Sequence, residues 1–162
     1  MTSLVIYGSR HGNTRKVAEA IAGELRKHGA VHLVPAESGA AIPLEQMDLV
    51  VIGGPTEAHR MTEPVVRFFD RVGGGALAGK AAAGFDTRLH WPRWLSGSAG
   101  SGIVERLRRA GARVIAPEES FFVSGKLPVP EPGELERAAA WAASLAAKLD
   151  TKELVAPGQA LA

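Results

Sequence analysis

Short hydrophobic runs alternate with amphipathic segments along most of the chain. Four segments, at residues 13–28, 62–72, 101–110 and 134–149, repeat apolar residues at the spacing of a helix with one buried face. The runs with the length and apolar character of buried β-strands lie at residues 4–7, 31–34, 49–52, 80–86 and 112–115. Such alternation is typical of βαβ units, so the sequence predicts a three-layer α/β domain with a doubly wound, five-stranded parallel sheet.

Four stretches lie outside this pattern. Residues 35–47 predict a loop with one helical turn, residues 87–100 a long polar loop, and residues 116–133 a proline-rich connection. Residues 151–162 have no periodicity and predict a flexible C-terminal tail that follows a single domain over residues 1–150.

The composition narrows the chemistry that the chain can perform. None of the 162 residues is cysteine, which excludes thiol nucleophiles, thiolate zinc sites and iron–sulfur clusters. A redox function would therefore need a bound cofactor. The spacing of the histidines matches no metal-binding pattern and no GxSxG motif is present, so we expect neither a metal site nor a catalytic residue.

The net charge of the chain does not indicate a strongly charged binding partner. Lys and Arg number 19 against 17 Asp and Glu, a net charge of +2, which does not favour a nucleic-acid-binding protein. The first residues lack the pattern of a signal peptide, and the apolar stretch at residues 138–147 is too short to span a bilayer. We expect a cytoplasmic protein that binds neither membranes nor nucleic acid.

Ligands of doubly wound sheets bind beyond the carboxyl ends of the strands. Here that rule selects the loops at residues 9–14, 55–61 and 87–97. The first loop joins a buried strand to a helix, so its backbone N–H groups face an open helix N-terminus that suits an anion. Gly12 would let the backbone approach a phosphate closely. A helix capped by Asn13 or Thr14 without any ligand is the alternative interpretation.

Two of these loops resemble the flavin loops of one family. The turn Ser9-x-x-Gly12-Asn13-Thr14 resembles the phosphate loop of flavodoxins, and Gly53-Gly54-Pro55-Thr56 resembles their second flavin loop. Residues 83–88, 97–102 and 118–145 are similar to flavodoxin-domain proteins of an actinobacterial type. The resemblance extends from Ser3 to about Leu149. It implies a flavodoxin-like fold with strand order 2-1-3-4-5 and FMN as a noncovalent cofactor.

The resemblance also implies which residues contact FMN. The first loop would hold the phosphate, the second would flank one side of the isoalloxazine, and the third would flank the other side. Trp91 and Trp94 are the candidates for a flat apolar surface against the ring. The implied contacts are Ser9, Arg10, His11, Gly12, Asn13 and Thr14, then Pro55, Thr56, Glu57, Ala58 and His59, then Asp86, Thr87, Arg88, Trp91 and Trp94.

The sequence departs from the flavodoxin pattern in ways that affect the cofactor. His11 stands where the family usually has a hydroxyl residue, and no aromatic residue lies within residues 55–61. Flavodoxins are usually strongly acidic, whereas this chain has a net charge of +2. Positive charge near the flavin stabilises its reduced anion, so we predict a less negative reduction potential than that of a low-potential flavodoxin.

The main interpretation is an FMN-binding protein that transfers electrons to or from a redox partner protein or a small acceptor. One alternative is an NAD(P)H-dependent FMN reductase acting on quinones or flavins, which the positive charges in the loops favour because they suit a pyridine nucleotide phosphate. The other is a flavodoxin-fold module that has lost its flavin, which His11 and the missing aromatic residue would explain.

Overall fold

The computed structural model describes residues 1–56, 61–90, 98–126 and 128–155. Its helices are α1 (Asn13–Leu25), α2 (Ala36–Gly39), α3 (Glu63–Val72), α5 (Ala99–Arg109) and α6 (Glu134–Val155), with a 3-10 turn at Leu44–Gln46. Its strands are β1 (Thr2–Tyr7), β2 (Ala30–Pro35), β3 (Leu49–Pro55), β4 (Ala81–Leu89), β5 (Arg113–Val114), β6 (Glu119–Ser124) and β7 (Val129–Pro130).

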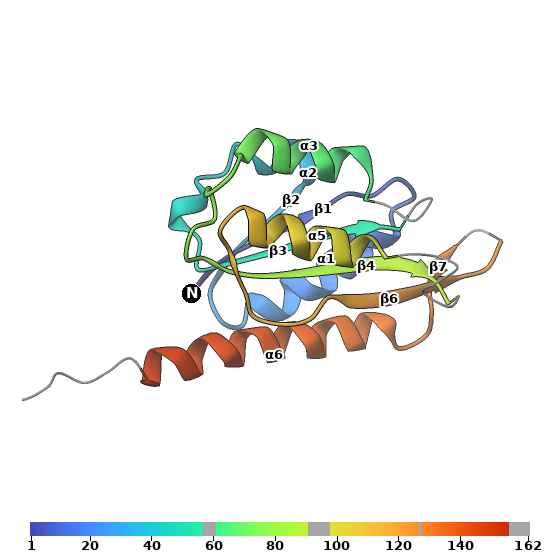
Figure 1. Cartoon of the computed structure of the whole chain (residues 1–162). Helices are drawn as coiled ribbons and strands as arrows, with labels where there is room; N and C mark the ends of the chain where they lie inside the picture. Colours follow the sequence, from blue (N-terminus) through green and yellow to red (C-terminus); the bar gives the residue numbers. More distant parts are fainter. Residues whose placement is uncertain (57–60, 91–97, 127, 156–162) are drawn as a thin grey trace, which may run out of the picture.

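These strands form one twisted sheet with helices on both faces, as Figure 1 shows. Within the described residues the strand order is β2-β1-β3-β4-β6-β7, and β5 pairs with β4 beside β6. All neighbours are parallel except β6 and β7, which form an antiparallel pair at the edge. Helices α1 and α6 cover one face, and α2, α3 and α5 cover the other. The doubly wound, three-layer fold predicted from the sequence is confirmed.

Alternate residues of the central strands supply the two halves of the core. Val5 packs with Val51 toward α1 and α6, whereas Ile6 packs with Ile52 toward α3 and α5. Each of these pairs lies in register between β1 and β3. Both faces of these strands are buried, which explains why their sequence is a continuous apolar run rather than an alternating pattern.

The fifth strand position differs from the prediction. The predicted strand at residues 112–115 is reduced to β5, which pairs with Ala81 and Ala82 at the start of β4. The stretch predicted as a proline-rich connection forms β6, which pairs with β4 from Phe85 to Leu89. Pro117 lies between the two strands and has no N–H to donate to the ladder. The pairing with β4 is therefore interrupted at Pro117 and continues along the same edge of β4 in β6. Together β5 and β6 occupy the fifth position of the implied order 2-1-3-4-5.

Two further boundaries differ from the sequence pattern. Helix α6 continues through Val155, past Thr151, where the pattern predicts that the tail begins. Strand β4 extends to Leu89, three residues beyond the predicted end at residue 86, and so carries Thr87 and Arg88 within the sheet.

No helix of the described chain is both long and apolar enough to cross a bilayer.

Candidate functional site

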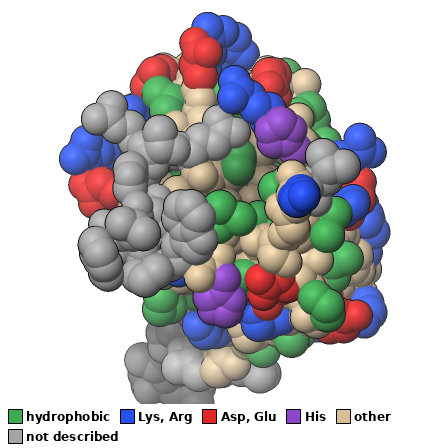
Figure 2. Space-filling view, turned by 90° about the vertical axis from the view of Figure 1, so that its right-hand side faces the viewer, with side chains coloured by type: hydrophobic (Ala, Val, Ile, Leu, Met, Phe, Trp, Pro, Cys, Tyr) green, Lys and Arg blue, Asp and Glu red, His purple; other side chains and the backbone are tan. Residues whose placement is uncertain are grey.

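The carboxyl ends of β1, β3 and β4 lie side by side at one end of the sheet. This end is on the right in Figure 1 and faces the viewer in Figure 2, where basic, acidic, histidine and hydrophobic side chains are interspersed. The described residues form a cleft of about 240 Å³ there. Its lining consists of Ser9, Arg10, His11, Asn13, Thr14, Pro55, Thr56, Thr87, Arg88, Leu89, Val123 and Pro128.

The first loop ends in an open helix N-terminus. Gly12 is the N-cap residue of α1, with φ of 84°, a left-handed conformation that favours glycine. The Gly12 N–H donates to Ser9 Oγ over 3.0 Å, which closes the turn. Because glycine has no side chain, it cannot cap the first turn of α1. A Cβ placed on Gly12 would meet no other part of the described structure within 4 Å, so the backbone there is open to a ligand.

The side chains of Asn13 and Thr14 are engaged with other parts of the chain. Asn13 Nδ2 donates to the carbonyl of Pro128 over 2.8 Å, which holds the β6–β7 hairpin against the first loop. Thr14 Oγ1 lies 2.8 Å from Thr87 Oγ1, in a hydrogen bond that joins the first loop to β4. Both residues are buried. The backbone N–H groups of the turn, rather than these two side chains, are therefore the groups suited to bind an anion.

The second and third loops are joined through Asp86. This residue is fully buried and lies beside the cleft rather than in its lining. Its Oδ2 accepts hydrogen bonds from Thr56 Oγ1 at 2.9 Å, from Ser98 Oγ at 2.9 Å and from the Gly100 N–H at 3.0 Å. Thr56 follows β3, whereas Ser98 and Gly100 lie at the beginning of α5. One carboxylate thus fixes two chain segments that are distant in the sequence.

The two helix N-termini at this end of the sheet differ in one decisive respect. At α5, side-chain oxygens of the chain itself accept hydrogen bonds from the free N–H groups of the first turn. The negative charge of Asp86 also complements the helix dipole. At α1, the cap is a glycine and the cleft opens beside it. An external anion is therefore expected at α1 and not at α5. This arrangement fits the phosphate of a mononucleotide.

Arg88 brings a positive charge to the wall of the cleft. Its side chain is largely buried, and its guanidinium lies 5.2 Å from the centroid of the Phe122 ring, a cation–π distance. The ring of His90 stacks on the same phenylalanine, with centroids 4.0 Å apart and planes within 6° of parallel. Phe122 of β6 therefore supports the end of β4 from the side.

Residues at the start of α6 hold β6 in place. Glu134 Oε2 accepts a hydrogen bond from the Phe122 N–H over 2.6 Å, and Arg137 bonds to both Glu134 and Glu119. Burial acts to raise the pKa of Glu134, but the hydrogen bonds from Arg137 and from the Phe122 N–H outweigh it, so that the pKa is lowered. The charged form of Glu134 is therefore stabilised by the fold.

The predicted contact residues fall into three groups. The cleft lining contains Ser9, Arg10, His11, Asn13, Thr14, Pro55, Thr56, Thr87 and Arg88, and Gly12 lies in the same turn. Asp86 lies behind the cleft. The predicted contacts Glu57, Ala58, His59, Trp91 and Trp94 lie outside the described residues.

Leu89, within the third selected loop, also lines the cleft, and sequence reasoning missed two further lining residues, Val123 and Pro128. Val123 and Pro128 come from the β6–β7 hairpin, in the stretch that the pattern predicts to be a connection. The segment Ser120-Phe121-Phe122-Val123 contains the aromatic and β-branched residues that favour strands, and this was the available signal.

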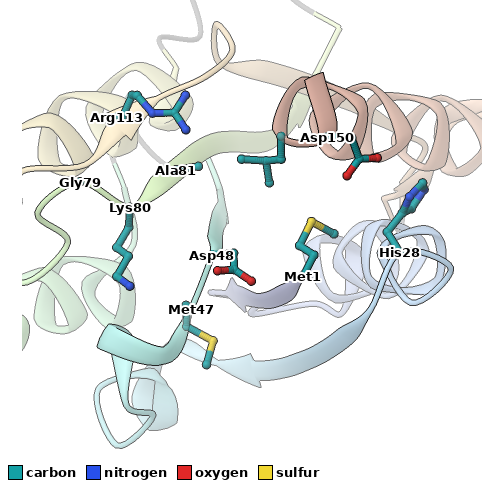
Figure 3. A pocket seen from close by; sticks show the side chains of 10 residues that line it. Met1, His28, Met47, Asp48, Gly79, Lys80, Ala81, Arg113 and Asp150 are labelled. Carbon is teal, nitrogen blue, oxygen red and sulfur yellow. The ribbon is translucent and has the colours of Figure 1, made fainter. Parts of the chain in front are cut away.

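A larger hollow, of about 440 Å³, lies at the opposite end of the sheet (Figure 3). Its walls mix His28, Lys80 and Arg113 with Asp48 and Asp150. Asp48 Oδ2 accepts a hydrogen bond from the Thr2 N–H over 2.6 Å, and Lys80 Nζ donates to the carbonyl of Glu45. Two of its charged groups are thus engaged with the chain itself. The hollow lies at the amino ends of the parallel strands, away from the edge where such sheets bind ligands.

A doubly wound sheet with a glycine-capped helix beside a cleft at the carboxyl ends of its strands is the arrangement of a flavodoxin-like α/β protein. The chain belongs to the flavodoxin-domain family, because the sequence model of the "Flavodoxin domain" matches residues 4–92. FMN is the cofactor of this family. The open turn at Gly12 fits its phosphate.

Curated relatives carry two different names. The chain is similar to an "NAD(P)H dehydrogenase (quinone)" of Methylocella silvestris, with 35% identity over 107 residues, covering 51% of this chain and 54% of that protein. It is also similar to a "Flavodoxin" of Aquifex aeolicus, with 33% identity over 93 residues, covering 54% of this chain and 50% of that protein. The chain thus spans about half the length of these curated relatives.

Solved structures show the same fold along nearly the whole chain. A flavodoxin from the domain Archaea superimposes with a TM-score of 0.74 at 23% identity, covering 93% of this chain and 99% of that one. Flavodoxin 2 from Bacillus cereus gives a TM-score of 0.77 at 23% identity, covering 91% and 99%. The flavodoxin-like fold implied by the resemblance is confirmed.

Proposed function

We propose that this protein binds FMN noncovalently in the cleft at the carboxyl ends of β1, β3 and β4 and serves as an electron carrier. The observation that supports this most directly is the glycine-capped N-terminus of α1, which opens into a cleft formed by these loops. The bound flavin supplies the redox chemistry by accepting and releasing electrons. The chain's own residues bind the flavin, orient it and set the charge around it.

Each loop has a distinct task in this proposal. The turn from Ser9 to Thr14 holds the phosphate through backbone N–H groups, with the Ser9 hydroxyl beside them. Pro55 and Thr56, at the end of β3, flank one side of the ring system, and Thr87 and Arg88, at the end of β4, flank the other. The Thr14–Thr87 hydrogen bond keeps the phosphate turn and the third loop at a fixed separation. Leu89 and Val123 add apolar surface to the cleft.

A comparison of FMN with riboflavin tests this proposal. We expect FMN to bind with one-to-one stoichiometry and with quenched flavin fluorescence. Riboflavin lacks the phosphate and is expected to bind at least tenfold more weakly, since each hydrogen bond to a charged oxygen contributes roughly 1.5–3 kcal/mol. The dissociation constants come from fluorescence titration of the apoprotein. Equal affinities would place the phosphate outside the turn, and a protein that binds no FMN would be the flavodoxin-fold module without flavin.

A reductase activity is the second candidate function. It is favoured by the names of the relatives, which are NAD(P)H dehydrogenases of quinones, and by Arg10 and Arg88 at the cleft, whose charge suits a pyridine nucleotide phosphate. Mixing the FMN-loaded protein with NADPH or NADH in a stopped-flow spectrometer distinguishes the two functions. Rapid bleaching of the flavin band followed by reoxidation with a quinone supports the reductase. An unchanged band supports a carrier that receives electrons from a protein partner or a small donor.

A further inference from the structure

Asp86 is a buried carboxylate that the proposed binding of FMN does not use directly. Its side chain is fully buried at the carboxyl end of β4, and it is absent from the lining of the cleft. Within the described residues, Oδ1 has no hydrogen-bond partner, whereas Oδ2 accepts three hydrogen bonds. A buried carboxylate is costly unless it is hydrogen-bonded, so these hydrogen bonds offset the cost of burying Asp86.

The direction of each hydrogen bond follows from its neighbours. The Ala99 N–H donates to Thr56 Oγ1 over 2.8 Å, and the Ser101 N–H donates to Ser98 Oγ over 3.3 Å. Each hydroxyl oxygen therefore accepts a hydrogen bond from an N–H of the first turn of α5 and donates its own O–H to Asp86. The Gly100 N–H reaches Asp86 directly. Asp86 is thus the common acceptor at which all three branches end.

This network connects the residue that follows β3 with the first turn of α5. Thr56 belongs to the loop after β3 and lines the cleft. Ser98 is the N-cap of α5 and lies at the end of the loop that follows β4. Asp86 lies on β4 between them, within the rigid sheet. The separation of Thr56 and Ser98 therefore depends on a residue behind the cleft.

We propose that Asp86 is a positioning residue of the flavin site, which fixes Thr56, just after β3, relative to Ser98, at the start of α5. Asp86 has no contact with the flavin in this proposal and acts only through these two residues. The inference rests on the proposed function, because the site whose geometry it controls is the FMN site.

Replacement of Asp86 by asparagine is the direct test. The amide has nearly the same shape but has one oxygen fewer. If that oxygen faces the three donors, it is a neutral and therefore weaker acceptor than the carboxylate, and the NH₂ group lies in the place of Oδ1, which accepts no hydrogen bond within the described residues. In the opposite orientation, the NH₂ group faces donors. In either case, the network is weakened, and we expect the dissociation constant for FMN to rise roughly tenfold.

A second pair of variants removes a single branch and then restores it. Ser98→Ala removes the cap of α5 and one donor to Asp86, whereas Ser98→Thr restores the hydroxyl on an extended backbone that accepts threonine. We expect Ser98→Ala to weaken FMN binding and Ser98→Thr to bind as the wild type does. If Asp86→Asn does not fold, the FMN affinities of these two variants test the proposal instead.

Leu107→Ala is the matched control for a general loss of stability. Leu107 is fully buried on the same helix, two turns beyond the network. Its truncation destabilises the packing of α5 but leaves the loops joined, so its affinity for FMN should match that of the wild type. Circular dichroism of each apoprotein verifies the fold.

Two measurements distinguish a positioning role of Asp86 from a general effect on the stability of the protein. Exchange of the backbone amides of residues 99–101, measured by NMR on the apoproteins, is expected to accelerate in Asp86→Asn and not in Leu107→Ala. In the FMN complexes, the visible flavin band should change shape in Asp86→Asn and keep the wild-type shape in the control. These two results, together with the loss of affinity, support the proposal.

The failures are distinguishable. A wild-type protein that binds no FMN overturns the proposed function and this inference with it. Wild-type affinity in a folded Asp86→Asn protein overturns the inference alone. Leu107→Ala losing as much affinity as Asp86→Asn, or Ser98→Thr failing to restore binding, also overturns it, because the effect would then follow stability rather than the hydrogen bonds.

Discussion

Gly53 and Phe85 lie opposite each other on neighbouring strands, and the glycine leaves room for the ring. A Cβ on Gly53 would lie 2.0 Å from Cζ of Phe85, which no real contact allows. Phe85 is fully buried, and its ring makes edge-to-face contacts with Phe121 and Trp141. The first glycine of the Gly53-Gly54-Pro55-Thr56 segment therefore has a packing role behind the cleft, in addition to the flavin-loop pattern to which it belongs.

Substitution of Gly53 by alanine tests this packing. We expect a loss of about 1–3 kcal/mol in the free energy of unfolding, because the ring of Phe85 must move within a close-packed core. Gly23→Ala is the matched control, since Gly23 lies in α1 with no heavy atom of the described structure near its would-be Cβ. There the same substitution should stabilise the helix by about 0.5–1 kcal/mol. Urea unfolding measures both, and equal effects would refute the packing argument.

At the scale of elements, the edge of the sheet depends on the start of α6. Strand β6 is followed by the short β7, and Glu134 and Arg137 bind the backbone of β6 at Phe122 and Ser120. The guanidinium of Arg137 also lies 4.6 Å from the centroid of the Phe121 ring. These contacts place the β6–β7 hairpin, which contributes Val123 and Pro128 to the cleft, against the first turn of the helix that follows it in the sequence.

The lowered pKa of Glu134 predicts how this anchor responds to pH. A group whose pKa is lower in the folded state contributes stability above its unfolded pKa of about 4.3, and this contribution disappears as the pH falls through the folded value. Glu134→Gln should therefore be less stable than the wild type at pH 7, with the difference shrinking below about pH 4. Urea unfolding at both pH values measures it. Glu105→Gln, at an exposed pair with Arg109, should show little difference at either pH. A gap for Glu134→Gln that widens in acid would contradict this prediction.

The elements show where sequence patterns suffice and where they do not. The apolar runs at residues 4–7 and 49–52 predicted β1 and β3 because both faces of these strands are buried. The same reasoning missed β6, since an edge strand beside Pro117 and Pro128 is defined mainly by its pairing with β4. The glycine turn at residues 9–14 was predictable from local chemistry, whereas the place of Asp86 behind the cleft depends on Thr56 and Ser98, which are remote in sequence.

At the scale of the whole molecule, the charge around the cleft is a property in which this protein differs from the usual acidic pattern of flavodoxins. The described residues that line the cleft include Arg10 and Arg88 but no Asp or Glu. The chain as a whole carries a net charge of +2. Positive potential favours the reduced flavin anion, so the prediction of a less negative potential gains a structural basis in these two arginines.

Arg88→Gln tests the effect of this charge on the potential. A unit charge about 10 Å away at an effective dielectric of about 20 contributes roughly 1.7 kcal/mol, or roughly 70 mV for one electron. We therefore expect the reduction potential of the bound flavin to become more negative by tens of millivolts, measured by equilibrium redox titration. Arg108→Gln, on the exposed surface of α5, removes the same charge away from the cleft and should shift the potential by far less. Equal shifts in the two variants would attribute the effect to net charge alone.

The order of elements, the central strands and the glycine turn after β1 were determined by the sequence itself, because hydrophobic periodicity and turn chemistry act between near neighbours in the chain. The tertiary structure alone decided that β6 completes the sheet and that the α5 N-terminus is already filled by Asp86 while the α1 N-terminus is open. Those features depend on contacts between residues far apart in sequence, such as Asn13 with Pro128, and such contacts exist only after the chain has folded.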